Sequence, residues 1–288
     1  MKNQELYGKM ALFMAAFLWG VSFIAVEKAM DFGWTPFNLL GVRGLLAGSA
    51  LMLFAFKRKF WFNGRLMFES ALAGFIMFLG MALQTYGQSL STVSNSSFIT
   101  VLYVVFIPIM LWKVQKPSFS VILAIVFGVM GTAFLTLQEG LSLRLGDVLL
   151  VGSAWMFGLH IIFLGRLARF HDVLGVSVVQ SYTMSLFGFI FALFLKQSIP
   201  SGGYIYVMYA GLMSSGLAFL LQLYGQRHVK PTAAGLFLTM EALFGSLGAI
   251  ILLNEPFTIN IFIGGGLMVL AVVTIELGPK LFLRIKGG

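Results

Sequence analysis

The segment LQTYGQ at Leu83–Gln88 returns, with one substitution, as LQLYGQ at Leu221–Gln226, an offset of 138 residues. The same offset relates three further pairs of identical residues: Gly8 and Gly146, Gly20 and Gly158, and Phe106 and Phe244. One offset that holds across separate segments indicates an internal duplication. We therefore predict two repeats, residues 1–138 and residues 139–288.

The composition is that of a membrane protein. Of 288 residues, 59% are hydrophobic and only 10% are charged, against about 25% charged residues in a soluble domain. A water-soluble chain of this length could not bury so much apolar surface. The chain has no cysteine, which excludes disulfides and thiolate metal sites. In a membrane protein the net charge of +9 indicates topology signals, and we expect no nucleic-acid partner.

Ten apolar segments approach the roughly 20 residues that a helix needs to cross a hydrocarbon core about 30 Å thick. The predicted spans are 8–26, 36–56, 69–90, 94–112, 119–138, 147–165, 174–195, 204–226, 232–252 and 258–277. Pro108 predicts a kink in the fourth span, because proline removes a backbone hydrogen bond. The predicted fold class is all-α and integral to the membrane, with ten transmembrane helices.

Lysine and arginine segregate between the two sides of these spans. The side that holds both termini carries 15 of the 19 residues, the other side carries three, and Arg43 lies inside a span. Positive residues favour the cytoplasmic side, so we predict a multi-pass protein of the cell membrane with both termini cytoplasmic. Each repeat holds five spans, and an odd number turns the second repeat upside down, as in secondary transporters.

Four motifs, in order, resemble one family. They are GKMALFMAAFLWGVSFIAVEKAM from Gly8, FNLLGVRGLLA around Arg43, GDVLLVGSAWMFGLHIIFLGRL from Gly146, and LLNEPFT around Glu255. The chain resembles the EamA-type, ten-helix branch of the drug/metabolite transporter superfamily over nearly its whole length. It departs from the family at Gln115, where glutamate is common, and its second half has no counterpart of Arg43. The resemblance implies export, or less often uptake, of amino acids, other metabolites or drugs.

Ionisable residues inside spans are costly and usually functional. Glu241 lies near the middle of the ninth span. It could carry a proton, pair with a substrate amine, or be a protonated side chain bonded to a neighbouring helix. Arg43 could bind a substrate carboxylate, pair with Glu241, reach the interface or cap carbonyls, and we favour a gating or structural role. His160 is a candidate proton relay, although packing with one satisfied nitrogen is the more common role of a lone histidine.

Two glutamine pairs mark equivalent helices. Gln84 and Gln88 share one helix face through their i, i+4 spacing, as do Gln222 and Gln226. With Tyr86 between the first pair, they could line a polar substrate path. They could equally be interhelical hydrogen-bond contacts, worth about 0.6 kcal/mol each on average. Gln88 and Gln226 lie near helix ends, so we assign them to gating or structure.

Trp19 and Trp155 are candidate pocket walls, on the strength of the resemblance. The candidate substrate-binding residues are Trp19, Gln84, Tyr86, Trp155, Gln222 and Glu241. The candidate gating or structural polar residues are Arg43, Gln88, His160 and Gln226.

We therefore expect a secondary transporter, favouring an exporter, that moves small metabolites such as amino acids or drugs by alternating access. The alternatives are a flippase of lipids or lipid-linked molecules and, least favoured, an intramembrane enzyme. The chain has no GxxxxGK[ST] motif, which argues against ATP hydrolysis. We expect no catalytic residue, cofactor or metal. The expected partners are a small-molecule substrate, membrane lipid and, as a candidate coupling ion, protons.

Overall fold

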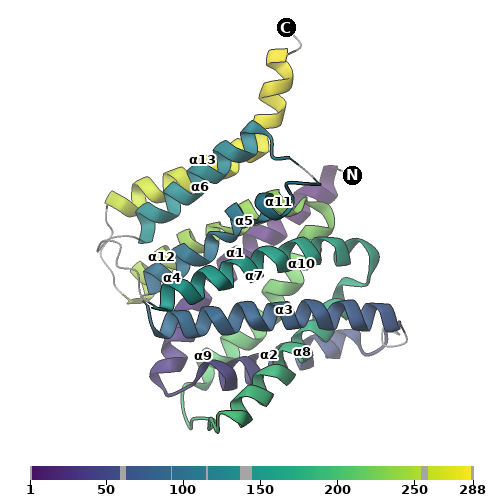
Figure 1. Cartoon of the computed structure of the whole chain (residues 1–288), viewed down its shortest axis with the longest axis vertical. Helices are drawn as coiled ribbons and strands as arrows, with labels where there is room; N and C mark the ends of the chain where they lie inside the picture. Colours follow the sequence, from purple (N-terminus) through teal and green to yellow (C-terminus); the bar gives the residue numbers. More distant parts are fainter. Residues whose placement is uncertain are drawn as a thin grey trace.

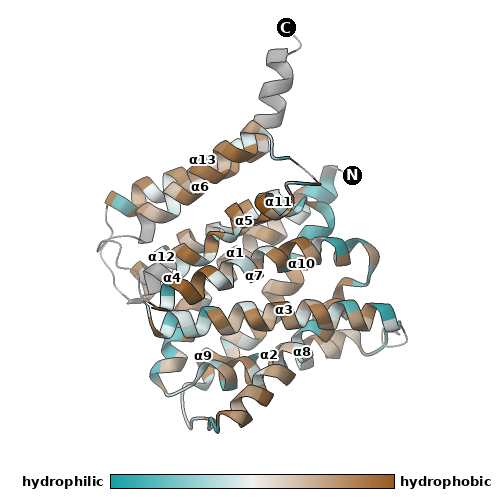
Figure 2. Cartoon of the chain, viewed as in Figure 1, coloured by the Kyte–Doolittle hydropathy of each residue, from teal (hydrophilic) through white to brown (hydrophobic). Residues whose placement is uncertain are grey.

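The computed structural model describes residues 2–58, 63–91, 93–114, 116–136, 145–253 and 259–286. Within these ranges every regular element is a helix, and most of the helices lie side by side as a bundle (Figure 1). Seven helices are long and apolar enough to cross a membrane, and three shorter apolar helices cover 96–110, 119–134 and 259–275. Apolar residues predominate along them (Figure 2). The predicted all-α membrane fold with ten spans is confirmed.

The first repeat supplies five spans, the fourth of them interrupted. Its helices are α1 (Lys2–Asp31), α2 (Pro36–Ala55), α3 (Gly64–Ser89), α4 (Val93–Val101), α5 (Tyr103–Met110) and α6 (Phe119–Thr136). Pro36 occupies the first turn of α2, where its fixed φ suits a helix and its missing N–H costs nothing. Leu102 separates α4 from α5, and its N–H bonds the carbonyl of Ile99 only three residues earlier.

The second repeat follows the same order. Its helices are α7 (Leu145–Phe170), α8 (Val173–Phe194), α9 (Tyr204–Met208), the π-helix η2 (Tyr209–Ala218), α10 (Phe219–His228), α11 (Pro231–Leu238), α12 (Met240–Leu253) and α13 (Ile259–Lys286). Asp172 caps α8 by accepting a hydrogen bond from the N–H of Gly175. Thr239 separates α11 from α12, so both repeats break their fourth span at matching places.

Several expectations differ in detail from the structure. α1 extends beyond the predicted 8–26 at both ends, and α3 begins at Gly64 rather than at residue 69. α5 continues through Pro108, and the interruption of that span falls earlier, at Leu102. Gln115, Glu255 and the predicted repeat boundary at 138/139 lie outside the described residues.

The turns at the two ends of the bundle reveal the relative direction of the halves. At one end, Arg58 of the α2–α3 turn lies 2.6 Å from Asp172 of the α7–α8 turn. At the other end of α2, Trp34 Nε1 in the α1–α2 turn donates to the Gly202 carbonyl, 2.8 Å away, in the α8–α9 turn. The α1–α2 and α7–α8 turns are repeat counterparts, yet they lie at opposite ends. The two halves are therefore inverted.

The same helix contact occurs twice, as an inverted repeat requires. A Cβ on Gly87 of α3 would lie 2.9 Å from the Gly146 carbonyl oxygen of α7. A Cβ on Gly225 of α10 would lie 2.7 Å from the Gly8 carbonyl oxygen of α1. Both pairs are related by the offset of 138 residues, and both need glycine because the backbones approach so closely. These crossings hold α1, α3, α7 and α10 around the centre of the bundle.

Candidate functional site

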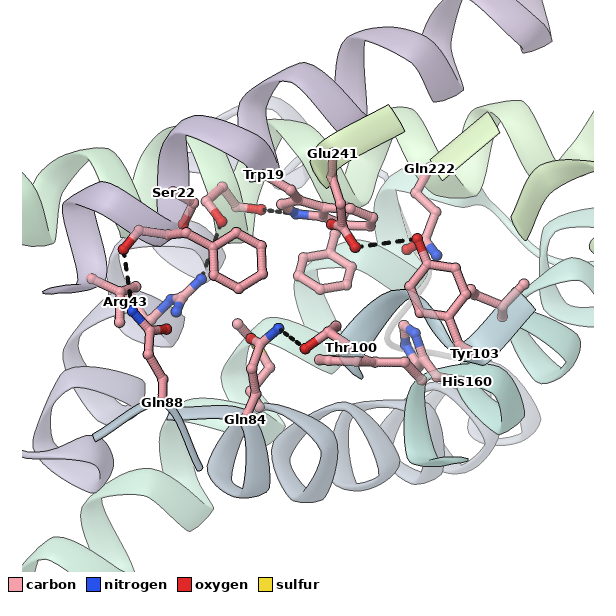
Figure 3. Close-up of a pocket in the computed structure, with 17 residues that line it drawn as sticks. Trp19, Ser22, Arg43, Gln84, Gln88, Thr100, Tyr103, His160, Gln222 and Glu241 are labelled. Carbon is pink, nitrogen blue, oxygen red and sulfur yellow. Dashed lines mark hydrogen bonds between the residues drawn. The ribbon is translucent and has the colours of Figure 1, made fainter. Parts of the chain in front are cut away.

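A cavity lies among the helices at the centre of the bundle, and Figure 3 shows polar and aromatic side chains converging on it. It encloses about 60 Å³, counted over positions open to the centre of a water-sized sphere. A single water needs only about 10–15 Å³ on this measure, so several waters or part of a small solute fit inside. Its walls mix apolar rings with a few polar groups, as small-molecule sites do.

Seven of the ten candidate residues line this cavity. Four come from the candidate substrate-binding set: Trp19, Gln84, Gln222 and Glu241. Three come from the gating or structural set: Arg43, Gln88 and His160. Residues from both repeats therefore meet at one place.

The other three candidates lie elsewhere. Tyr86 packs against Phe37, with ring centroids 5.4 Å apart. Trp155 is 43% exposed on the outside of the bundle and contacts Phe106. Gln226 is buried and donates to the Ile161 carbonyl at 2.7 Å. We therefore leave these residues out of the candidate cavity site.

Glu241 lies in the first turn of α12, just after the break at Thr239. It is 5% exposed, and the Tyr103 hydroxyl donates a hydrogen bond of 3.2 Å to its Oε1. Tyr103 itself begins α5 directly after the break at Leu102. Interrupted helices near the bilayer midplane form the substrate and ion sites of many transporters. Here both interruptions flank one buried carboxyl–phenol pair.

Arg43 is buried rather than extended to an interface. Its Nε donates to Ser215 Oγ at 2.8 Å and its terminal nitrogen to Ser214 Oγ at 3.1 Å. Both serines belong to η2, and Trp19 Nε1 donates to the Ser214 carbonyl at 3.0 Å. π-Helical segments often occur at functional sites. Arg43 and Trp19 together hold this segment against the cavity.

The amide side chains differ in how completely they are bonded. Gln84 Nε2 donates to Thr100 Oγ1 at 3.3 Å. Gln222 is only 1% exposed, and its Oε1 has no hydrogen-bond partner within the described chain. Buried polar atoms are rarely left unpaired, so this acceptor, at the cavity wall, is suited to a donor from water or a bound solute. His160 Nε2 lies 3.3 Å from Gln180 Oε1.

Ser22, Thr100, Phe157 and Ser214 also line the cavity and are missing from the sequence-based set. The repeat offset could have found two of them, because it relates His160 to Ser22 and Trp19 to Phe157. Thr100 and Ser214 give no such signal. Among the described residues, no three His, Asp or Glu side chains gather as a metal site would require.

Comparisons with known proteins agree with this architecture. The EamA-like transporter family matches the chain twice, at residues 6–137 and 144–277. A protein of Archaeoglobus fulgidus named "Uncharacterized transporter" is 28% identical over 95% of this chain and 87% of its own length. One of Methanothermobacter thermautotrophicus with the same name is 24% identical, over 93% and 86%. A solved crystal structure superimposes with a TM-score of 0.81 at 14% identity, covering 96% of this chain and 98% of that one; this likeness concerns the fold alone.

Proposed function

Because this chain belongs to the EamA-like transporter family, we propose that it is a secondary transporter whose central cavity binds a small metabolite, such as an amino acid or a drug. We further propose that it works as an exporter, by alternating access between two inverted repeats. Gln222 carries this proposal, since it presents a buried acceptor with no partner in the described chain to the cavity.

The chemistry of the walls supports a polar solute. The cavity places a carboxyl group, Glu241, and a guanidinium, Arg43, along one space with the amides of Gln84 and Gln222. Acceptors and donors of both charge types suit a solute with an amine and an acidic or carbonyl group. The aromatic rings of Trp19 and Phe219, 4.9 Å apart, offer an apolar surface for the rest of such a solute.

Flux into proteoliposomes tests the proposal directly. A panel of radiolabelled amino acids, amines and drugs would be screened with the natural chain and with Gln222→Leu, which keeps the approximate volume but removes the acceptor. We expect one solute class to move with the natural chain and to lose about tenfold in rate with the variant, about the 1.4 kcal/mol of one hydrogen bond. If no panel member crosses faster than in empty liposomes, or if Gln222→Leu transports normally, this assignment fails.

Proton coupling through Glu241 is a separate part of the proposal. An imposed pH gradient should accelerate flux of the natural chain, while Glu241→Gln should abolish that acceleration, because an amide cannot carry the proton. If flux of the natural chain ignores the gradient and also survives Glu241→Gln, the transporter is not proton-coupled at this residue.

We also propose residence in the cell membrane with both termini in the cytoplasm. The support is the excess of Lys and Arg, 15 against three, on the side of the termini. Membership of a transporter family and transporter-named relatives favour this function over an intramembrane enzyme.

A further inference from the structure

Gln88 of α3 and Gln226 of α10 make the same contact in the two repeats, but at different lengths. Gln226 Nε2 donates to the Ile161 carbonyl at 2.7 Å, whereas Gln88 Nε2 lies 3.4 Å from the Phe23 carbonyl. Phe23 and Ile161, like the two glutamines, are related by the offset of 138 residues. N–H···O bonds in proteins usually measure 2.7–3.2 Å. The contact is therefore fully formed in the second repeat and loose in the first.

The surroundings of the two glutamines differ in the same sense. Gln88 and its neighbour Val26 line the cavity, but their counterparts Gln226 and Leu164 do not. Leu164 is instead fully buried with Leu223 in an apolar cluster. The helices agree, since α7 packs along α10, whereas α1 and α3 approach each other at most marginally in the described chain. The cavity thus extends toward Gln88 and is sealed before it reaches Gln226.

A chain with two inverted, similar halves has a second conformation of comparable energy, in which the halves exchange their local arrangements. We propose that Gln88 and Gln226 are two alternating latches: each, when bonded to the first helix of its repeat, closes one end of the cavity. In this structure the Gln226 latch is closed and the Gln88 latch is open. The proposal rests on the proposed transport function and adds the residues that switch it.

The reverse conformation follows from the offset. α1 and α3 would close until Gln88 bonds the Phe23 carbonyl fully, covering Val26. α7 would separate from α10, so that Leu164 and Gln226 line the cavity. Gln226 Oε1 is buried here with no hydrogen-bond partner in the described chain, and the reverse conformation would expose it to water or solute.

The absence of cysteine from the chain makes a thiol-labelling experiment clean. Val26→Cys and Leu164→Cys each introduce a single thiol, one beside each latch. The rate of modification by a small, water-soluble methanethiosulfonate is measured on the full chain in detergent, where both ends are accessible. With both latches intact, we expect the thiol of the Val26→Cys variant to react faster.

Removing a latch should then shift the two rates in opposite directions. Gln226→Met should raise the rate in the Leu164→Cys background and lower it in the Val26→Cys background, and Gln88→Met should do the reverse. The expected size is about threefold each way, from the typical 0.6 kcal/mol of an interhelical hydrogen bond in a membrane. Each comparison is made within one reporter background, so the cost of the reporter substitution cancels.

Gln4→Met, on the exposed first turn of α1, is the matched control and should leave both rates unchanged. If both rates rise together with a latch variant, the glutamine merely holds the fold, and the proposal is overturned. Unchanged rates overturn it too. Should a methionine variant fail to purify as a folded protein, Gln88→Asn and Gln226→Asn, whose shorter amides cannot reach the carbonyls, carry the same test. Labelling needs no substrate, so its failure is distinguishable from a failed flux assay.

Discussion

The Tyr103 hydroxyl donates a 3.2 Å hydrogen bond to Glu241, and these two residues are each other's counterparts at the offset of 138 residues. A residue can contact its own repeat counterpart only near the axis that relates the halves. The pair therefore marks the centre of the inverted repeat, beside both helix interruptions. It is also where the halves differ chemically, since one supplies a phenol and the other a carboxyl group.

Tyr103→Phe should lower transport with little change in shape, because it removes only the hydroxyl that orients Glu241. A hydrogen bond to an ionisable group is worth roughly 1.5–3 kcal/mol, so we expect the rate of solute flux to fall about tenfold or more. The measurement is initial flux in proteoliposomes at equal protein content.

Tyr86→Phe is the control for this substitution, because Tyr86 lies in the same repeat but outside the cavity. It should transport as the natural chain does. Equal losses in the two tyrosine variants would mean that the Tyr103–Glu241 bond has no special part in transport.

Trp19→Phe should weaken the attachment of α1 to η2, since it removes the indole N–H that donates to the Ser214 carbonyl. We expect a loss of about 1 kcal/mol in the free energy of unfolding, the usual value of a hydrogen bond, together with reduced flux. Trp155→Phe, on the exposed side of α7, should change neither quantity by more than about 0.5 kcal/mol or its equivalent. Thermal unfolding in detergent compares the two, and a larger loss for Trp155→Phe would contradict the assignment.

The helices could be predicted from sequence because apolar length alone identifies a span, and the repeat because its offset is constant. The interruptions at Leu102 and Thr239 could not. Each depends on which carbonyl a backbone N–H bonds, and tertiary packing decides that. η2 is of the same kind, since its serine hydroxyls accept from Arg43 of a distant helix.

The site could be predicted where a polar residue interrupts an apolar run, as Gln222 and Glu241 do. Tyr86 was included because it stands between Gln84 and Gln88, but a position two residues away faces the other side of a helix. Trp155 was paired with Trp19 as a tryptophan, whereas the true counterpart of Trp19 is Phe157, which lines the cavity. The offset is a better guide to the second repeat than residue type.

Gly188→Ala should separate α2 from α8. A Cβ at Gly188 would lie 2.4 Å from the backbone nitrogen of Gly41, and neither backbone can yield without moving its helix. Overpacking of this kind costs about 1–3 kcal/mol. Gly266→Ala in α13 meets no atom within 4 Å and should be neutral or stabilising by up to about 1 kcal/mol, because alanine favours helix. Thermal unfolding of both variants tests the contrast, and equal midpoints would refute it.

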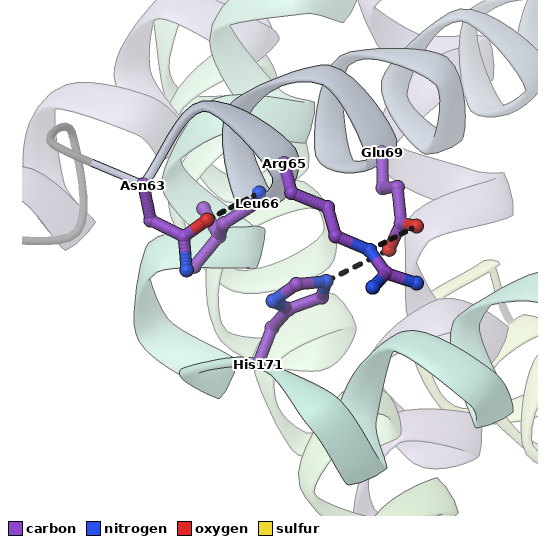
Figure 4. Close-up of polar contacts among 5 residues, drawn as sticks. All are labelled: Asn63, Arg65, Leu66, Glu69 and His171. Atoms are coloured by element: carbon purple, nitrogen blue, oxygen red, sulfur yellow. Dashed lines mark hydrogen bonds and ion pairs between the residues drawn. The ribbon is translucent and has the colours of Figure 1, made fainter.

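Thiol labelling in intact cells should find the repeats inverted across the membrane. At one end of the bundle, Glu69 of α3 lies 2.8 Å from His171 of the α7–α8 turn and 3.0 Å from Arg65 (Figure 4). Lys57→Cys and Arg169→Cys, which flank this contact, should therefore react with an impermeant maleimide only after permeabilisation, if this end is cytoplasmic.

Phe32→Cys and Ser198→Cys test the opposite end, where Thr35 Oγ1 donates to Gln197 Oε1 at 2.6 Å. Both thiols should react in intact cells, because α2 and α8 separate them from the first pair. The decisive comparison is Phe32→Cys with Arg169→Cys, since these positions belong to counterpart turns of the two repeats. Parallel halves would place both on one side, so labelling of both from the same side would contradict the inversion, whereas an exchange of all four results would reverse only the orientation.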